Sequence, residues 1–183
     1  HGINRHGKRV VLHLSLGGSE SAISGKAAVE SLVERGLRPA RLIISDGNPG
    51  LLRAIKDVWP EVPRQRCVVH RTWNVLARVP RKRQKEIKAA LWQIFHAACL
   101  EDAESQAKKF LERYGREFPM ACEVLSQHLG ECLTFYRFPQ RHWKAIRSTN
   151  ALERAFKEVR RRTNVVGRFP GEKAALAVVF GVL

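Results

Sequence analysis

The stretch Arg41-Leu42-Ile43-Ile44-Ser45-Asp46-Gly47 decides the fold class. Its apolar run is too short for a helix and closes on a carboxylate and a glycine, which is typical of a buried strand. Turn residues follow in Gly47-Asn48-Pro49-Gly50, and the apolar spacing of Leu51 to Trp59 then predicts a helix. A buried strand that leads directly into a helix is the repeating unit of an α/β protein.

Two further strands are predicted on either side of this unit. Lys8 to Leu16 is rich in β-branched residues and leucine, and Arg66 to His70 forms a shorter run of the same kind. Between the first two strands, apolar residues recur at helical spacing from Lys26 to Arg35, before Gly36. The order strand–helix–strand–helix–strand predicts an α/β sheet with parallel neighbours.

The pattern becomes helical after Arg71. Apolar residues recur at helical spacing in Arg83 to Cys99, in Glu101 to Tyr114 and in Phe118 to Leu129. No strand is predicted before Pro139. We therefore expect an all-helical block over about residues 71–137, followed by a helix over Asn150 to Arg162 with Leu152, Phe156 and Val159 facing a core.

Positive charge is concentrated in two segments of this chain. The net charge is +16, and residues 64–88 hold nine lysines and arginines against one glutamate. Residues 141–173 hold ten against three glutamates, so the remainder of the chain is nearly neutral. Such clustering predicts a polyanionic partner, most simply nucleic acid, and two solvated basic helix faces are the alternative.

Composition predicts a globular intracellular protein. The 44% of hydrophobic and 27% of charged residues exclude a disordered tail, and the longest apolar run, Val178 to Leu183, is too short to span a bilayer. The start of the chain has no apolar segment typical of a signal peptide. We therefore expect no membrane association, a cytoplasmic (bacterial, nucleoid-associated) protein and four cysteines that are free thiols.

Two carboxylates are candidate metal ligands. Asp46 follows the carboxyl end of a predicted strand, where open α/β sheets place their active sites. Glu153 lies near the start of a basic helix in Arg147-Ser-Thr-Asn-Ala-Leu-Glu153-Arg, whose same stripe continues with Lys157 and Arg160. Taken together, they suggest acids that converge on divalent metal for phosphoryl transfer, which typically uses two ions about 3.5–4 Å apart. Mg²⁺ prefers such oxygen ligands.

Each of these residues also has a structural interpretation. Asp46-Gly47 is a common turn former, and Asn150-x-x-Glu153 fits a helix capping box. Cys67-x-x-His70 could be half of a zinc site, although no other cysteine or histidine pair has the spacing that a closed site needs.

The tryptophans have two possible roles. Trp143, flanked by cations, either stacks on an unpaired base or belongs to the core. Trp73 and Trp92 lie at helical positions, and we expect them in the core.

Five motifs resemble one known family in order and cover most of the chain. They are Ile43-Ile-Ser-Asp-Gly-Asn-Pro-Gly-Leu51, Gln65-Arg-Cys-Val-Val-His70, Phe138-Pro-Gln-Arg-His-Trp143, Arg147-Ser-Thr-Asn-Ala-Leu-Glu-Arg154 and Arg160-Arg-Arg-Thr-Asn-Val-Val-Gly-Arg-Phe-Pro170. The chain is similar in these motifs to the catalytic core of Mutator-type bacterial insertion-sequence transposases.

The resemblance implies a fold, an activity and a catalytic site. The family has a ribonuclease H-like core interrupted by an all-helical insertion, and an Asp-Asp-Glu triad that cleaves DNA and transfers strands with Mg²⁺ or Mn²⁺. Asp46 then corresponds to the second acid and Glu153, 107 positions later, to the third. Cys67 and His70 correspond to a signature between these acids. We expect a structural role for Cys67 and a place near the scissile phosphate for His70, and a buried histidine with satisfied hydrogen bonds is the alternative for His70.

The chain also departs from the family pattern. The first acid of the triad lies on the first strand of the core, and no Asp or Glu precedes Glu20 here. Lys8 to Leu16 resembles the third strand, so we expect the first strands to be absent and the core to be incomplete. The expected organisation is a partial core over residues 1–70, a helical insertion over 71–140 and the C-terminal helical part of the core, with the third acid, over 141–183.

Two hypotheses about function follow. The first is a transposase core that acts on element ends and target DNA, as a homo-oligomer in its active complex, with this chain truncated and inactive alone. The second is a non-catalytic nucleic-acid-binding remnant. The residues that we expect to contact DNA are Arg66, Arg71, Trp143, Arg147, Asn150, Lys157, Arg160, Arg161 and Arg162.

Overall fold

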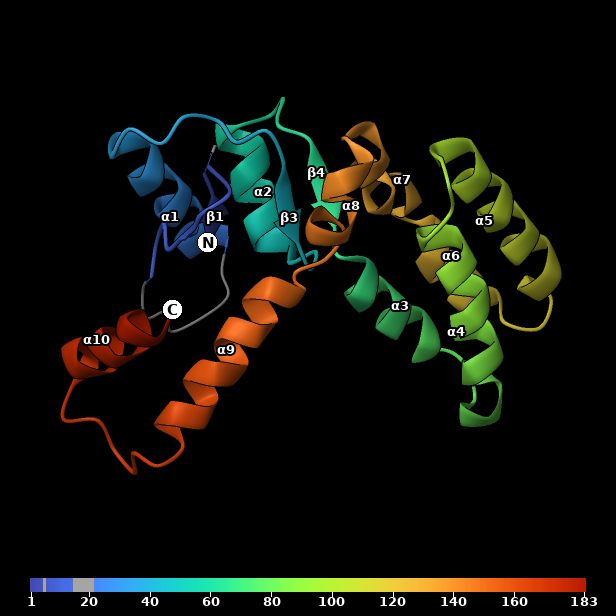
Figure 1. Ribbon diagram of the computed structural model, residues 1–183. Helices are drawn as coiled ribbons and strands as arrows, with labels where there is room; N and C mark the ends of the chain where they lie inside the picture. Colours follow the sequence, from blue (N-terminus) through green and yellow to red (C-terminus); the bar gives the residue numbers. More distant parts are fainter. Residues whose placement is uncertain (5, 15–21) are drawn as a thin grey trace. The chain divides into compact units, whose positions relative to one another are not determined.

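The computed structural model describes residues 1–4, 6–14 and 22–183, without the side chains of residues 22–24 and 151. The described elements, in chain order, are β1 (Gly2–Ile3), β2 (Arg9–Val10), α1 (Ala22–Glu34), β3 (Ile43–Ser45), α2 (Pro49–Val58), β4 (Arg64–Arg66), α3 (Val68–Leu76), α4 (Arg81–Phe95), α5 (Leu100–Tyr114), α6 (Pro119–Ser126), α7 (Leu129–Cys132), the 3₁₀ helix η1 (Thr134–Arg137), α8 (Gln140–Ile146), α9 (Asn150–Thr163) and α10 (Glu172–Val182) (Figure 1). The protein is thus a mostly helical α/β protein with two small sheets.

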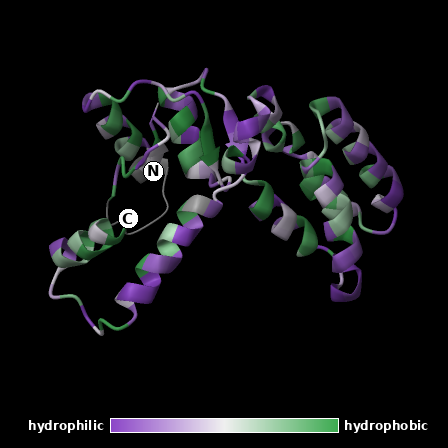
Figure 2. Ribbon diagram, viewed as in Figure 1, coloured by the Kyte–Doolittle hydropathy of each residue, from purple (hydrophilic) through white to green (hydrophobic). Residues whose placement is uncertain are grey.

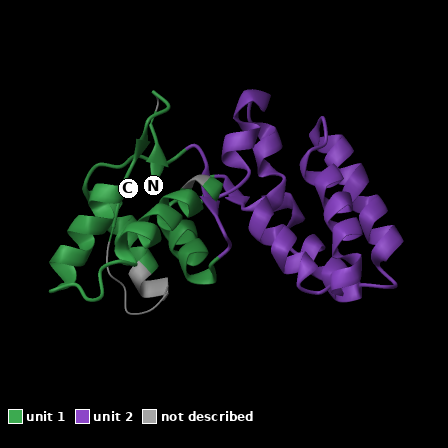
Figure 3. Cartoon of the chain, turned by 60° about the horizontal axis from the view of Figure 1, so that its bottom comes forward, with its two compact units in different colours: residues 1–40, 48–62, 150–183 green, residues 41–47, 63–149 purple. Residues whose placement is uncertain are grey.

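The chain divides into two compact units, each assembled from segments that are distant in sequence (Figure 3). The first unit contains residues 1–40, 48–62 and 150–183, and the second contains residues 41–47 and 63–149. The chain passes from the first unit into the second after residue 40 and again after residue 62, and it returns to the first unit each time.

The parallel pairing predicted for the sheet is confirmed in the second unit. β3 and β4 are parallel, with Ile43 opposite Arg64 and Ser45 opposite Arg66. The predicted strand over Arg66 to His70 was wrong in its position, because the strand ends at Arg66 and Val68 already begins α3. Val68 and Val75 are buried at helical spacing on α3, and this periodicity outweighs the short β-branched run.

Gln65 explains why a strand forms in the polar segment Arg64–Arg66. Its side chain is completely buried. Its amide Nε2 donates to the carbonyl oxygen of Cys132 at 2.8 Å, and its Oε1 accepts from the backbone N–H of Phe135 at 2.7 Å. The strand is therefore stabilised by contacts with α7 and η1 rather than by its own β propensity.

The helical block predicted after Arg71 is confirmed, because residues 68–146 contain helices and no strand. α4 packs on α5, and α3 packs on α6 and α4 (Figure 1). The core of this block consists of apolar side chains from α3 to η1. Its most buried large members are Phe135, Ile87, Leu91, Ile94, Leu125 and Val75.

The first unit contains a short hairpin in place of the first predicted strand. Of Lys8 to Leu16, only Arg9–Val10 is a strand in the described residues, and it pairs with β1 antiparallel rather than with β3. The cause is local: the Asn4 side chain accepts from the backbone N–H groups of His6 and Lys8 and closes a tight turn. Ser15 and Leu16, the last two residues of the predicted strand, lie outside the described residues.

Helices make up the rest of the first unit. α1 packs on α2, whose first turn is capped by the Asn48 side chain accepting from the backbone N–H of Leu51 at 3.0 Å. α9 is amphipathic, and α10 is largely apolar (Figure 2). Val159 of α9 is buried as predicted, whereas Phe156 is 44% exposed. Among the helices of the described residues, none has the length and apolar content that crossing a membrane requires.

Candidate active site at the carboxyl ends of the parallel strands

Asp46 and Cys67 are neighbours because each follows the last residue of a parallel strand. The backbone N–H of Cys67 donates to the carbonyl oxygen of Ser45 at 2.8 Å, which extends the pairing one residue beyond the ladder. Asp46 is exposed and Cys67 is completely buried. A carboxylate therefore faces solvent at the edge of the sheet where open α/β proteins place their sites.

Gly47 allows the chain to turn away immediately after Asp46. Its φ is +103°, a conformation that glycine adopts readily and other residues rarely do. A side chain at this position would also meet the Arg66 guanidinium, which lies over Gly47. The turn therefore favours glycine because of its φ, and a side chain there would in addition displace the Arg66 guanidinium.

Arg66, one of the predicted DNA contacts, is largely covered and paired within the protein. Its side chain is 12% exposed, and its Nε donates to Glu131 Oε2 at 3.2 Å. His128 also approaches the same carboxylate, that of Glu131. Burial, as the larger effect, and the positive charge of Arg66 lower the pKa of this histidine. The positive charge next to Gly47 is therefore already compensated by an acid of α7.

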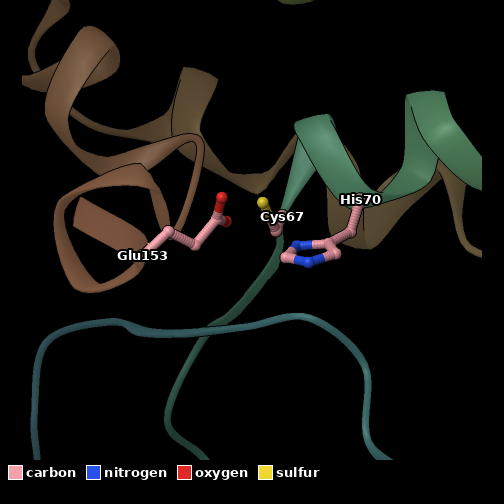
Figure 4. A group of neighbouring side chains, drawn as sticks. All are labelled: Cys67, His70 and Glu153. Atoms are coloured by element: carbon pink, nitrogen blue, oxygen red, sulfur yellow. The ribbon is translucent and has the colours of Figure 1, made fainter. Parts of the chain in front are cut away.

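The Cys67-x-x-His70 motif spans the start of α3. Cys67 precedes the helix and His70 lies in its first turn (Figure 4). Both approach Thr149: its hydroxyl is 3.2 Å from Cys67 Sγ and 3.5 Å from His70 Nδ1. Thr149 was not among the residues predicted from the sequence, although its position directly before a helix was a usable signal.

The segment before α9 is attached to the start of α3 by its backbone as well. The backbone N–H of Val68 donates to the carbonyl oxygen of Arg147 at 3.0 Å, and the backbone N–H of Thr149 donates to Cys67 Sγ at 3.3 Å. Ser148, between them, is buried. This short segment thus runs alongside the junction of β4 and α3.

The predicted acids belong to different compact units. Asp46 is in the second unit, and Glu153, also drawn in Figure 4, lies in the first turn of α9 in the first unit. α9 begins at Asn150, so Asn150 is its first helical residue, one position later than the N-cap position that the predicted capping box assigns to it.

Four of the predicted DNA contacts are exposed on α9. They are Lys157, Arg160, Arg161 and Arg162. Glu158 compensates two of them, because Arg161 Nη2 donates to it at 2.7 Å and Arg162 Nε at 2.8 Å. The hydrogen bond from Arg161 has the larger effect and that from Arg162 the next, and together they lower the pKa of the Glu158 carboxyl to about 2.

Three other predicted DNA contacts are partly or completely covered by the protein. Arg71 is buried and donates to the carbonyl oxygen of Val124 at 2.6 Å. Arg147 donates to the carbonyl oxygen of Phe95, and burial lowers the pKa of its guanidinium. Trp143 packs against the rings of Phe135 and Tyr136 and donates its indole N–H to a backbone carbonyl.

The expectation that Trp73 and Trp92 lie in the core was wrong. Trp73 is 54% exposed on α3, where its ring contacts His70 edge to face at 5.2 Å between centroids. Trp92 is 57% exposed on α4 and stacks on His96. On both helices the buried stripe runs through other positions, and the indole lies off it.

The four cysteines are free thiols, as predicted. Burial raises the pKa of Cys122, and raises that of Cys132 to about 11. Because zinc binds the deprotonated thiolate, these two side chains are poor ligands for it.

Comparison with known proteins gives one consistent family. A family model described as "Transposase, Mutator family" matches residues 1–183. The transposase for insertion sequence element IS406 of Burkholderia multivorans is 38% identical over 183 residues, which are 100% of this chain and 47% of that relative. The transposase for insertion sequence element IST2 of Acidithiobacillus ferrooxidans is 37% identical over 183 residues, 100% of this chain and 62% of the relative.

A third relative is similar over nearly the same length. The transposase for insertion sequence element ISRM5 of Rhizobium meliloti is 35% identical over 178 residues, 97% of this chain and 45% of the relative. The chain therefore spans roughly half the length of the curated relatives that it matches.

Proposed function

This chain belongs to the Mutator family of transposases, and from that premise we propose that it forms part of the catalytic core of an enzyme that cuts and joins DNA in the transposition of an insertion sequence. In this proposal, Asp46 and Glu153 are two of its metal-binding acids. The core is ribonuclease H-like, and the helices of residues 71–140 are its insertion.

The observation that carries the proposal is the meeting of three motifs at one edge of the parallel strand pair. Asp46 follows β3, and Cys67 follows β4. Thr149, in the motif that contains Glu153, contacts Cys67 from 82 positions away. An exposed carboxylate, a histidine and the entry to the third motif are thus gathered at the place where α/β enzymes hold their reacting groups.

The covalent chain limits how far Glu153 can lie from this edge. Thr149 directly precedes α9, and Glu153 is in its first turn. The Cα atoms of residues one helical turn apart are separated by about 6 Å, whichever way the helix points. Glu153 therefore lies one helical turn along the chain from Thr149, which is hydrogen-bonded to Cys67.

Two carboxylates suit a divalent cation of the Mg²⁺ or Mn²⁺ type. Hard cations bind carboxylate oxygens and keep several waters, so a few acids suffice to hold them. Asp46 and Glu153 would hold the ion, which would supply charge stabilisation to the phosphate oxygens. His70, half-buried and held near Thr149, would contact the scissile phosphate.

The proposed DNA-binding surface consists of exposed cations and one exposed aromatic ring. Lys157, Arg160, Arg161 and Arg162 would neutralise phosphates. Trp73 replaces Trp143 as the proposed stacking platform for an unpaired base, because it is exposed and adjoins His70, whereas Trp143 is packed. Arg71 is left out because its guanidinium is buried. Assembly as a homo-oligomer on paired element ends is part of the same proposal.

Substitution of each acid tests the catalytic role. In the transposase that carries this segment, Asp46→Asn and Glu153→Gln should each abolish Mg²⁺-dependent nicking at an element end and leave DNA binding intact. Asp57→Asn, at an exposed acid of α2, is the matched control and should nick normally. Nicking that survives Asp46→Asn would remove this residue from the site, and binding without any nicking in the unsubstituted protein would favour a non-catalytic DNA-binding protein.

A further inference from the structure

We infer that Cys67 and Thr149 are positioning residues that fix the point at which α9 begins, one helical turn before Glu153. The inference rests on the proposed function, because it assigns Cys67 and Thr149 a role in presenting a metal-binding acid. We call the group Cys67, Thr149 and His70 the α9 anchor. Its three members belong to the same compact unit, and the first residue of α9 follows directly.

The sulfur of Cys67 is the centre of the α9 anchor. It accepts two hydrogen bonds from one residue: from the Thr149 backbone N–H at 3.3 Å and from the Thr149 hydroxyl at 3.2 Å. Cys67 is 0% exposed, so its sulfur is shielded from solvent. Although a thiol is a weak acceptor, removal of the sulfur would take away the partner that two groups of Thr149 share.

Cys67 is itself held rigidly. Its backbone N–H donates to Ser45 at the end of β3, and its carbonyl oxygen accepts from the backbone N–H of Arg71 as the first bond of α3. The next residue, Val68, donates to the carbonyl oxygen of Arg147. The α9 anchor therefore ties the last residues before α9 to the same strand end that carries Asp46.

His70 completes the α9 anchor and is oriented by it. Its Nδ1 lies 3.5 Å from the Thr149 hydroxyl, whose proton is directed to Cys67 Sγ. Thr149 thus couples the orientation of His70 to the start of α9.

Hydrogen exchange tests the anchoring directly and does not depend on activity. In Cys67→Ala and Thr149→Val, peptides that cover residues 150–158 should exchange about 5- to 10-fold faster than in the unsubstituted chain, because the start of α9 is released. Thr149→Ser keeps the hydroxyl and should restore slow exchange. Unchanged exchange in Thr149→Val would overturn the inference, and this variant decides the question if Cys67→Ala does not fold.

The matched control removes a comparable hydroxyl from the same region. Thr72 donates to the carbonyl oxygen of Val68 at 2.8 Å, within α3 and away from residue 149. Thr72→Val should leave the exchange of residues 150–158 unchanged. Equal acceleration in Thr72→Val would mean that any loosening of α3 reaches α9, which also contradicts a specific role for the α9 anchor.

Metal dependence distinguishes positioning from simple stability. In the transposase that carries this segment, Thr149→Val should lower the nicking rate about 10- to 100-fold and raise the Mn²⁺ concentration for half-maximal rate, as loss of ligand-orienting partners does. The DNA dissociation constant should change less than about 2-fold, because no phosphate contact is removed. Faster exchange without any change in nicking would refute the positioning role, whereas nicking that persists in Asp46→Asn would instead refute the proposed function.

Discussion

Gln65 and Phe135 are joined by a completely buried hydrogen bond, although 70 positions separate them. The backbone N–H of Phe135 donates to Gln65 Oε1 at 2.7 Å, while Gln65 Nε2 donates to the carbonyl oxygen of Cys132. One side chain therefore supplies both a donor and an acceptor to the backbone of α7 and η1, as a neighbouring strand would. The second strand of the parallel pair depends on this contact with the helical block.

Gln65→Leu should lower the free energy of unfolding by about 2–6 kcal/mol, because two buried backbone groups lose their partner at about 1–3 kcal/mol each. Urea denaturation measures the change. Gln127→Leu is the matched control, since Gln127 is exposed and its side chain donates to Glu123 of the preceding helix α6; it should change stability by less than about 0.5 kcal/mol. Equal effects of the two substitutions would show that the buried contacts contribute nothing specific.

Gln65 also marks the limit of what the sequence could predict about the fold. Helices were predictable because buried residues recur with the helical period, as Ile87, Leu91 and Ile94 do on α4. β3 was predictable from its apolar run. β4, with the sequence Arg-Gln-Arg, has no apolar run that predicts a strand, and its pairing with β3 and the contacts of Gln65 with Cys132 and Phe135 hold it in place.

Gly47→Ala should destabilise the protein by about 1–2 kcal/mol, the cost of a left-handed conformation for a residue with a Cβ atom. Gly47 has φ +103°, and a Cβ atom there would displace the Arg66 guanidinium. Gly130→Ala is the control, because Gly130 lies in α7 with open space around it and should tolerate alanine or gain stability. A neutral Gly47→Ala would show that the turn after Asp46 has no conformational constraint.

Site residues that follow strand ends or lie in motifs could be predicted from the sequence. Site residues whose position depends on tertiary contacts could not. Asp46 could be placed because it follows an apolar run and precedes Gly47. The contact of Thr149 with Cys67 could not be predicted, because the two residues are 82 positions apart and no periodic pattern in the sequence indicates that they meet. Trp73 was assigned to the core from its helical position, whereas the buried stripe of α3 runs through Val68, Arg71 and Val75.

Glu158→Gln should raise the affinity of the chain for duplex DNA about 3- to 10-fold at low salt, because Arg161 and Arg162 lose the carboxylate that competes with phosphates. The slope of log affinity against log salt should steepen by about one to two. Fluorescence anisotropy across a salt series measures both. Glu104→Gln, at an exposed acid of α5, is the control and should change neither value.

The pH dependence of this effect follows from the carboxyl of Glu158. Its pKa is lowered to about 2, so the pairing with the arginines is complete above its ordinary pKa of 4.5 and is lost as the pH falls toward about 2. The difference between Glu158→Gln and the unsubstituted chain should therefore be constant between about pH 5 and pH 8. A difference that disappears within this range would show that another group controls the arginines.

Trp73→Ala should weaken binding to single-stranded DNA about 5- to 150-fold, because stacking of one base contributes about 1–3 kcal/mol. Trp73 is exposed beside His70, so its loss should leave the unfolding transition nearly unchanged. Trp92→Ala is the matched control: Trp92 is equally exposed but lies on α4 and stacks on His96, and its loss should not affect binding.

Trp143→Ala should show the opposite behaviour, a loss of about 3 kcal/mol in stability, because its ring packs on Phe135 and Tyr136. Two measurements on each variant, anisotropy with a single-stranded oligonucleotide and urea denaturation, therefore separate the two tryptophans. A Trp73→Ala variant that binds as well as Trp92→Ala would exclude base stacking at α3. A Trp143→Ala variant that is stable but binds single-stranded DNA poorly would show that Trp143, and not Trp73, stacks on the base. The packing of Trp143 on Phe135 and Tyr136 would then be unnecessary for the fold.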